Sequence, residues 1–440
     1  MKFHYKKTWL LDEKLILKEG KKLSGYSQNL SKNSKAGGYH FLESSINLPS
    51  DSVKMEEVKR VVQQVRTKNL KYIVVIGIGG SNLGTKAIYD ALWGHYETLE
   101  PHRFPKLLFS DTTDVKWLAK CGSFLQKEIN SPDEILMVCI SKSGGTTELI
   151  VNFEILFGFL KKKWNTFLNR CIVITDEGSK LALLASQKGI LLLFIPKEVG
   201  GRYSVFSPVG LFPLMLLGVD CKELLSGARA MRDICLSTRV EKNPALQSAL
   251  VQFLLNGEQR TISDMFLFAP SLESLGKWYR QLLAESIGKE FDRDGKVVHC
   301  GIMPTVSIGS TDLHSMGQLY LAGPNDKMTT FVSVASVGSN KENVSVPKKG
   351  VFNGLVDSIY GKTSAEIMNA ILSGIKRTYQ KKKIPFCEIV LDDISPKSLG
   401  EFMQFKMMEV MFLGELFNVN AFDQPNVEEY KIETKRVLKK

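Results

Sequence analysis

The chain has 440 residues, of which 44% are hydrophobic and 24% are charged, a balance typical of a soluble globular protein with two or three domains. No apolar run approaches the roughly 20 residues that span a bilayer, and Asp12 and Glu13 interrupt the stretch where a signal peptide would be apolar. The formal net charge of +12 suits an anionic ligand, but the basic runs lack the interleaved aromatic residues or known module typical of nucleic-acid binding. We therefore expect neither a membrane protein nor a nucleic-acid-binding protein.

The first 199 residues predict an N-terminal extension followed by one α/β unit. Residues 1–50 lack clear periodicity, and the Ser-, Lys- and Gly-rich residues 27–38 predict a loop. From residue 52 onward, short apolar strands alternate with helices, which predicts a parallel sheet covered on both faces. We expect strands at 72–78, 106–111, 134–141, 171–176 and 190–196, and helices at 52–69, 85–96, 114–121 and 146–160.

The second half of the chain predicts a helical stretch and then another α/β unit. The sequence GGRYS at 200–204 opens the helical stretch, and a looser alternation of strands and helices follows it. We expect strands at 262–270, 297–304, 329–336 and 387–393, and helices at 271–287, 312–321, 363–379 and 398–417. The whole chain is therefore predicted to hold two α/β units of similar kind.

Seven cysteines are present, and their pattern favours buried reduced thiols over disulfides or a metal site. The number is odd, no C-x-x-C occurs, and several cysteines lie in apolar runs. Cys300 follows His299, but no further ligands are close in sequence. We therefore expect no metal, and a cytoplasmic location.

Two glycine-rich loops follow predicted strands. In IVVIGIGGSNLG (73–84), Asn82 stands where a dinucleotide-binding fingerprint has its third Gly, and no Walker lysine is present, so neither a nicotinamide nor a P-loop nucleotide is expected. The second loop, ISKSGGTTE (140–148), offers hydroxyl groups and two glycines just before a helix, an arrangement that favours a phosphate. Because ligands of open parallel sheets bind at the carboxyl ends of the strands, the two loops together predict a small phosphorylated ligand between them.

This pair of loops resembles the sugar-isomerase (SIS) domain, and the resemblance continues along the chain. The blocks GGRYSVFSPVG (200–210), WYRQLLAESIGK (278–289), TDLHSMGQLYLAGP (311–324) and FDQPNVEEYK (422–431) are similar to successive blocks of the glucose-6-phosphate isomerase family. The resemblance covers about residues 70–435, and the length is similar to that of the compact bacterial form. It implies two flavodoxin-like, doubly wound SIS domains with helical N- and C-terminal extensions.

The resemblance also implies domain boundaries and partners. We expect an N-terminal extension at 1–50, SIS-type domains at 51–199 and 200–395, and a C-terminal helical segment at 396–440 that contributes to the active site. The implied reaction interconverts glucose 6-phosphate and fructose 6-phosphate without a cofactor. The implied assembly is a homodimer with shared active sites.

Aldose–ketose isomerisation needs a base that moves a proton between C1 and C2, stabilisation of the enediolate, and help in opening the sugar ring. The resemblance assigns the proton transfer to Glu285 and a substrate contact to Gln281, which lies four residues earlier on the same predicted helix face. It assigns enediolate stabilisation to Arg202, an always-charged group that follows two glycines at a lobe boundary.

Ring opening is assigned by the resemblance to His314, supplied by the neighbouring subunit, and to Lys431. His314 is expected in the first turn of a helix, where the dipole favours a neutral imidazole that can accept a proton. Gln424 precedes Lys431 by seven residues, about two helical turns, so both are expected to face one site as substrate-binding and catalytic residues.

The remaining implied contacts come from the two glycine-rich loops. The first loop would contact the sugar and the second would hold the phosphate, through Gly80, Ser81, Ser141, Lys142, Ser143 and Thr146. The alternative left open is a sugar-phosphate-binding regulator that is built from SIS domains and does no chemistry. Such a regulator would not need Glu285, His314 and Lys431, and all three are present.

Overall fold

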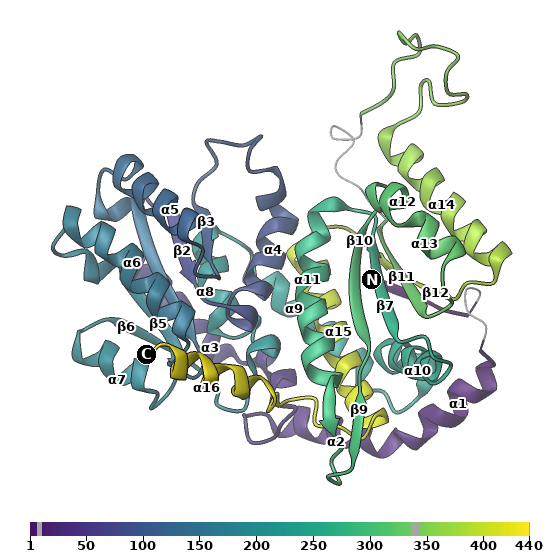
Figure 1. Cartoon of the computed structure of the whole chain (residues 1–440), viewed down its shortest axis with the longest axis horizontal. Coiled ribbons are helices and arrows are strands. Elements are labelled where there is room, and N and C mark those ends of the chain that lie inside the picture. Colours follow the sequence, from purple (N-terminus) through teal and green to yellow (C-terminus); the bar gives the residue numbers. More distant parts are fainter. Residues whose placement is uncertain (7–10, 336–343, 440) are drawn as a thin grey trace.

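The computed structural model describes residues 1–6, 11–335 and 344–439. Residues 7–10, 336–343 and 440 lie outside the described residues; they belong to the predicted N-terminal extension, second domain and C-terminal segment, and residue 336 ends one predicted strand. Two lobes, each built on one sheet, flank a layer of helices (Figure 1). In the described ranges no helix is both long and apolar enough to cross a membrane.

The first sheet is fully parallel and has the strand order β3-β2-β4-β5-β6, which is the flavodoxin-like order 2-1-3-4-5. Its strands lie where the apolar runs predict them, and all of β4 is buried. The strands are β2 (Tyr72–Ile76), β3 (Lys106–Ser110), β4 (Ile135–Ser141), β5 (Cys171–Asp176) and β6 (Leu191–Ile195). The helices of this lobe are α3 (Ser52–Val65), α4 (Leu83–Leu92), α5 (Val115–Glu128), α6 (Thr147–Lys163) and α7 (Lys180–Gln187).

The second sheet repeats the same order in four parallel strands and takes its fifth strand from the N-terminus. Counted from the edge, the order is β10-β7-β11-β12-β1, with only β1 antiparallel. The strands are β1 (Lys2–His4), β7 (Ile262–Leu267), β10 (Met303–Ile308), β11 (Lys327–Val334) and β12 (Phe386–Leu391). The two doubly wound sheets confirm the predicted fold class, while the domain boundaries stay a prediction.

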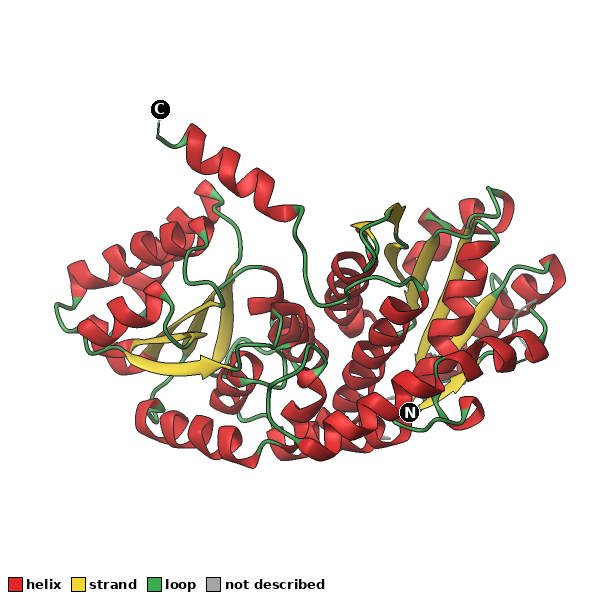
Figure 2. Cartoon of the chain, turned by 90° about the horizontal axis from the view of Figure 1, so that it is seen from below, coloured by secondary structure: helices red, strands yellow, loops and turns green. Residues whose placement is uncertain are grey.

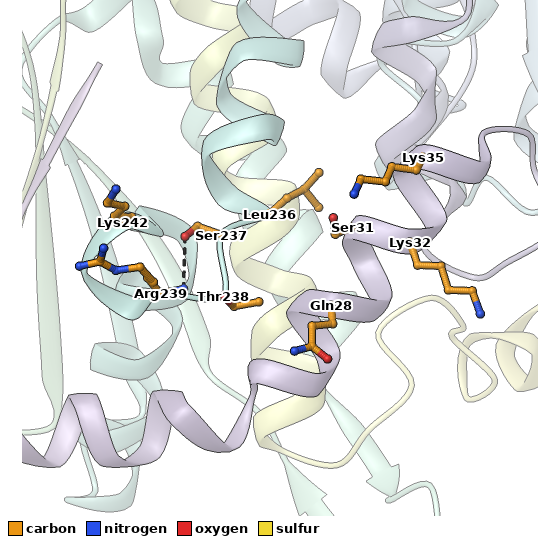
Figure 3. A pocket seen from close by; sticks show the side chains of 9 residues that line it. All are labelled: Gln28, Ser31, Lys32, Lys35, Leu236, Ser237, Thr238, Arg239 and Lys242. Carbon is orange, nitrogen blue, oxygen red and sulfur yellow. Dashed lines mark hydrogen bonds between the residues drawn. The ribbon is translucent and has the colours of Figure 1, made fainter.

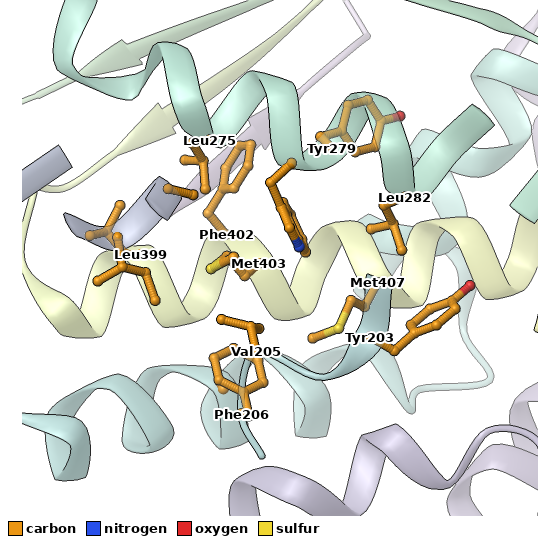
Figure 4. Packing of buried hydrophobic residues seen from close by; sticks show 14 of the residues in the cluster. Tyr203, Val205, Phe206, Leu275, Tyr279, Leu282, Leu399, Phe402, Met403 and Met407 are labelled. Carbon is orange, nitrogen blue, oxygen red and sulfur yellow. The ribbon is translucent and has the colours of Figure 1, made fainter. Parts of the chain in front are cut away.

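The helical layer between the lobes holds the largest apolar core. Its helices and those of the second lobe are α8 (Pro208–Leu217), α9 (Cys221–Cys235), α10 (Pro244–Gly257), α11 (Glu273–Ile287), α12 (Thr311–Ser315), α13 (Gly317–Ala322), α14 (Ser364–Lys382), α15 (Pro396–Leu416) and α16 (Val427–Val437). Buried aromatic and aliphatic side chains of α15 pack between α11 and the segment 203–206 (Figure 4). This core therefore fixes the segment after Arg202 against the helix that carries Glu285.

Glycines allow α15 to approach α9 closely. A Cβ atom at Gly400 would lie 2.0 Å from the Leu224 carbonyl oxygen, and one at Gly227 would lie 2.0 Å from the Lys397 carbonyl oxygen. These distances are far below any van der Waals contact. The two helices can therefore cross at this distance only with glycine at both positions.

Two predicted elements were wrong, and one helix of the first lobe was missed. Residues 27–38, predicted as a loop, lie largely in α2 (Ser24–Ala36), which follows α1 (Glu13–Lys22). Only three side chains of α2 are buried, so its sequence shows little amphipathic pattern. The predicted strand 297–304 is two strands, β9 (Val297–Cys300), which pairs with β8 (Lys289–Phe291), and β10. The short helix α7 between β5 and β6 was not predicted.

All seven cysteines are free thiols, as predicted, and six of them are buried. Burial raises the pKa of Cys121, Cys139 and Cys221 to about 12. Thiols with such pKa values are protonated and unreactive at neutral pH.

Candidate active site

The two glycine-rich loops follow adjacent strands of the first sheet. β2 pairs directly with β4, so that Ile76 lies opposite Cys139, while β3 and β5 lie on the outer sides of this pair. In a doubly wound sheet the strand order reverses at such a pair, and ligands bind there beyond the carboxyl ends of the strands. The prediction that the two loops are neighbours is thus confirmed.

The first loop is glycine-rich because two other segments approach its backbone. A Cβ atom at Gly79, where φ is 58°, would lie 2.7 Å from Gln281 Nε2. A Cβ atom at Gly80 would lie 2.1 Å from the carbonyl carbon of Gly201. Gly79, Gly80 and Ser81 form a single 3₁₀ turn. The loop therefore lies directly beside α11 and beside the GGR segment, both of which carry predicted site residues.

The second loop leads into the N-terminus of the 17-residue helix α6. Ser141 Oγ lies 3.1 Å from Thr146 Oγ1 and accepts the amide hydrogen of Gly144 at 3.1 Å. Gly144 has φ of 69°, and the Ser143 hydroxyl accepts the Gly145 amide at 3.5 Å. Thr146 precedes α6 but makes no capping hydrogen bond with its side chain. The loop thus presents hydroxyl groups at a positive helix end, which suits a phosphate.

The Lys142 side chain points toward the segment that follows β6. Its ammonium group donates to the carbonyl oxygen of Lys197 at 2.6 Å. Asp176, at the end of β5, lies in the same region, and burial raises its pKa to about 6 although Lys142 and Lys197 lower it. This contact uses one of the three ammonium donors, so two remain for a phosphate.

Arg202 is the buried centre of the site and joins three segments. Its guanidinium donates to Ser286 Oγ at 2.7 Å and contacts Glu285 Oε2 at 3.2 Å. It also donates to Gln424 Oε1 at 2.6 Å and to the carbonyl oxygens of Ala421 and Asp423 at 2.7 and 3.0 Å. The side chain is only 1% exposed. This full set of acceptors fixes the guanidinium plane in place.

Glu285 lies near the C-terminal end of α11, with its carboxylate held from two sides. Gln281 Nε2 donates to Oε1 at 3.0 Å, and Arg202 contacts Oε2. The Glu285 side chain is 35% exposed, so one side of the carboxylate remains accessible. The buried Oε1 of Gln281 has no hydrogen-bond partner among the described residues. The predicted pairing of Gln281 with Glu285 on one helix face is confirmed.

Sequence reasoning missed Lys289, which fastens α11, the helix that carries Glu285, to the C-terminal segment. Its ammonium group donates to the Glu285 carbonyl oxygen at 2.7 Å and to the Asp423 carbonyl oxygen at 2.6 Å, and lies 3.3 Å from Asp423 Oδ1. Burial lowers its pKa, and the positive charge of Arg202 lowers it further. The signal was present in ES-x-GK, where Lys289 follows Glu285 by one helical turn.

Gln424 and Lys431 do not share a helix, contrary to the prediction from their spacing. Gln424 precedes α16 and contacts Arg202, whereas Lys431 lies within α16 and pairs with Glu428 at 2.6 Å. No residue of α16 is buried, and the helix projects away from the body of the chain (Figure 2). The structure therefore places Gln424 in the site and leaves Lys431 outside it within one chain.

His314 lies at the other end of α11 from Glu285. Because β7 and β10 are parallel, α11 and α12 begin at the same edge of the second sheet (Figure 1). Glu285 is the thirteenth residue of α11, about 18 Å along the helix from that edge. His314 is exposed on α12, so it does not reach the Glu285 of its own chain.

The described residues contain no group of three or more His, Cys, Asp or Glu side chains placed to hold a metal ion. The polar groups that converge on this site are instead one arginine, two amides, one carboxylate and the hydroxyls of the phosphate-type loop. Such a set can hold an anionic polyol and move a proton on it.

Comparison with known proteins identifies relatives of this chain. A family model described as phosphoglucose isomerase matches residues 52–440. The glucose-6-phosphate isomerase of Carboxydothermus hydrogenoformans is 35% identical over 396 residues, which cover 89% of this chain and 83% of the relative. That of Methanocaldococcus jannaschii is 36% identical, with 83% and 84% of the two chains covered.

Solved structures agree on the fold. The crystal structure of a hypothetical protein from Thermus thermophilus superposes with a TM-score of 0.84 at 28% identity over 99% of each chain. That of a glucose-6-phosphate isomerase from Chlamydia trachomatis gives a TM-score of 0.80 at 20% identity over 99% of this chain and 88% of the other.

Proposed function

The chain belongs to the phosphoglucose isomerase family, and we propose that it interconverts glucose 6-phosphate and fructose 6-phosphate with Glu285 as the base. The observation that carries the assignment of the base is the position of the Glu285 carboxylate, held by Gln281 and Arg202 with one side open.

In the proposed reaction the Glu285 carboxylate removes the C2 proton of the open-chain aldose and returns it to C1. The carbonyl moves from C1 to C2, and one proton passes from O2 to O1, so no atom is gained or lost. The enediolate formed between these steps carries negative charge next to the guanidinium of Arg202. Because Arg202 is already fixed by its other acceptors, it stabilises this charge without reorganising.

The phosphate of the substrate would bind at the second loop. The hydroxyls of Ser141, Ser143 and Thr146 and the N-terminal amides of α6 supply donors there, while Gly80 and Ser81 approach the sugar. Binding energy from the phosphate, remote from C1 and C2, positions the reacting carbons against Glu285.

For ring opening, neither of the two predicted groups lies beside Glu285 within one chain. His314 is about a helix length from Glu285, and Lys431 lies on the projecting helix α16. We therefore propose a homodimer, acting in the cytoplasm, in which His314 of the partner subunit completes the site. Lys431 would reach it by a movement of α16, since no described residue buries that helix.

The test is a coupled assay of glucose 6-phosphate formed from fructose 6-phosphate, with chelated wild type beside Glu285→Gln. We expect turnover by wild type and a loss of at least about a thousandfold in kcat for the variant, because the amide cannot accept the proton. An inactive wild type whose Tm is still raised by fructose 6-phosphate would overturn the proposal in favour of the non-catalytic regulator.

The shared site is tested by mixing two inactive variants, Glu285→Gln and His314→Ala. If His314 acts across the dimer, mixed dimers contain one intact site, and refolding the variants together restores up to about a quarter of wild-type activity. No recovery in a sample shown to contain mixed dimers would contradict a partner-supplied His314.

A further inference from the structure

A buried polar network joins three helices and one strand behind the helix that carries Glu285. Its centre is the ion pair of Lys406 and Glu409 on α15, whose Nζ and Oε2 atoms lie 2.8 Å apart, with side chains 1% and 0% exposed. Tyr279 of α11 donates to Glu409 Oε1 at 2.6 Å, and Ser248 of α10 donates to Oε2. Side chains from three helices therefore bind this one carboxylate.

The phenol of Tyr279 is held from a second side as well. Gln252 Nε2 on α10 donates to the Tyr279 hydroxyl at 3.3 Å, and Gln252 Oε1 accepts from Ser263 of β7 at 3.1 Å. The Lys406 ammonium group also lies 4.5 Å from the centre of the Tyr279 ring. Because these bonds link α10, α15 and β7 to one phenol, they fix its position.

The network is closed to solvent, so it is not a ligand site. Each of its residues, Ser248, Gln252, Ser263, Tyr279, Lys406 and Glu409, is at most 5% exposed. Two surface cavities of about 690 and 410 Å³ are lined by other residues, and the larger lies between α2 and the segment that joins α9 to α10 (Figure 3). A buried ion pair also adds little stability beyond that of apolar side chains of similar volume. What it can supply is one fixed arrangement of the elements that it joins.

Apolar contacts between α11 and α15 do not fix that arrangement by themselves. Leu275 and Leu282 of α11 lie in the same apolar core as Phe402 and Met403 of α15 (Figure 4). Such contacts are non-directional, so they tolerate a small rotation of one helix against the other. The hydrogen bond from Tyr279 to a buried charge is directional and costly to lose. This bond therefore specifies the rotation of α11.

The rotation of α11 decides where the candidate base lies. Tyr279 is buried, whereas Gln281 and Glu285, two and six residues further along, lie on the partly exposed side of the same helix. A rotation of about 10° moves a group that is about 6 Å from the helix axis by about 1 Å. A misplacement of this size can cost about a hundredfold in rate. We propose that Glu409 is a positioning residue that acts through Tyr279 to place Glu285, an inference that rests on the proposed function of Glu285 as the base.

The test compares Tyr279→Phe with Ser248→Ala. Each variant removes one hydroxyl donor from the Glu409 carboxylate, but only Tyr279→Phe removes the donor on α11. We expect Tyr279→Phe to lower kcat at least about tenfold and to change KM for fructose 6-phosphate less than about threefold, because the phosphate loop belongs to the first lobe. Ser248→Ala is expected to lower Tm but to keep kcat near that of wild type, since Lys406 still holds Oε2.

A third variant separates position from stability. Tyr279→Phe/Lys406→Met/Glu409→Leu replaces the polar centre by apolar side chains and leaves no buried charge unpaired, so it is expected to fold at least as stably as Tyr279→Phe. We expect it to show the same loss of kcat. Wild-type kcat in this folded variant, or equal kcat in Tyr279→Phe and Ser248→Ala, would overturn the inference and leave the isomerase activity established. An inactive wild type would instead overturn the proposed function, and this inference with it.

Discussion

The Arg202 guanidinium and the Glu285 carboxylate meet at 3.2 Å, with the arginine side chain 1% exposed and the glutamate side chain 35% exposed. The arginine is thus fixed by protein groups on its buried side, and the glutamate keeps an accessible side for a substrate proton. Because the arginine is buried, removal of the glutamate carboxylate leaves its charge without this counterion, which is costly.

Arg202→Lys is expected to lower kcat at least about a hundredfold even though it keeps the charge. Lysine has three donors, whereas the arginine now serves five acceptors on Glu285, Ser286, Gln424, Ala421 and Asp423. At least two of these acceptors lose the arginine as a donor, although Tyr203 still bonds Ser286 and the Ala421 carbonyl, so the unfolding free energy should fall by about 1–3 kcal/mol. Steady-state kinetics and urea denaturation check both effects. Near-wild-type kcat would mean that charge alone suffices.

Lys289→Met is expected to lower kcat more than it changes KM for fructose 6-phosphate. Lys289 contacts no predicted substrate-binding group but ties the Glu285 carbonyl to Asp423, so its loss frees the end of α11 that carries the proposed base. A loss of about ten- to a hundredfold in kcat is expected, since misplacement of a catalytic group by about 1 Å has such effects. A fall in Tm with unchanged kcat would show a purely structural role.

Gly80→Ala is expected to reduce kcat/KM at least about a hundredfold. A Cβ atom at Gly80 would lie 2.1 Å from the Gly201 carbonyl carbon and 2.4 Å from the Arg202 amide nitrogen, so the two loops must separate and Arg202 must move. The control is Gly158→Ala in α6, where nothing lies within 4 Å. Kinetics and thermal melting of both variants check this. The control should be fully active and more stable by about 0.5–1 kcal/mol.

Thr146→Val tests the phosphate loop without disturbing a helix cap, because the Thr146 side chain makes no capping bond. Loss of one charge-assisted hydrogen bond, about 1.5–3 kcal/mol, should raise KM for fructose 6-phosphate about tenfold or more with little change in kcat. Thr166→Val, at another uncapped helix start, is the control for loss of a threonine hydroxyl. Equal KM values in both variants would place the phosphate elsewhere.

The sheets could be predicted from the sequence because each buried parallel strand is an apolar run between loops. The predicted strand 134–141, for example, corresponds to β4 (Ile135–Ser141). Strand β1 and helix α2 could not be predicted, because each is stabilised by contacts with residues that are distant in the sequence. β1 pairs with β12, at the opposite end of the sequence, and α2 is polar along most of its surface.

The site residues that act through their side chains could be predicted from the sequence. The contacts made by backbone atoms could not. Glu285, Gln281 and Arg202 lie together as expected. The carbonyl oxygens of Ala421 and Asp423 that fix Arg202 carry no residue-type signal, because every residue has a carbonyl group. The spacing of Gln424 and Lys431 gave a wrong prediction of a shared helix, because the segment between them is helical only from Val427 onward.

Asp176 should make the stability of the chain depend on pH between about 4 and 6. Burial raises its pKa to about 6 from an ordinary value near 3.8, and its Oδ1 has no partner among the described residues. Between these pH values the folded state binds more protons than the unfolded state, so the unfolding free energy falls as pH rises toward 6. Above pH 6 the carboxylate is charged in both the folded and the unfolded state, so the unfolding free energy falls no further.

Asp176→Asn is therefore expected to be more stable than wild type at pH 7.5. A shift of about two pKa units corresponds to at most about 3 kcal/mol, and the half-buried side chain reduces the expected gain to about 1 kcal/mol. The gain should shrink toward zero at pH 4.5, where the folded-state carboxyl of wild type is mostly protonated. Urea midpoints of the two proteins in phosphate-free buffer at both pH values measure it. A difference that is the same at both values would show that Asp176 is not the titrating group.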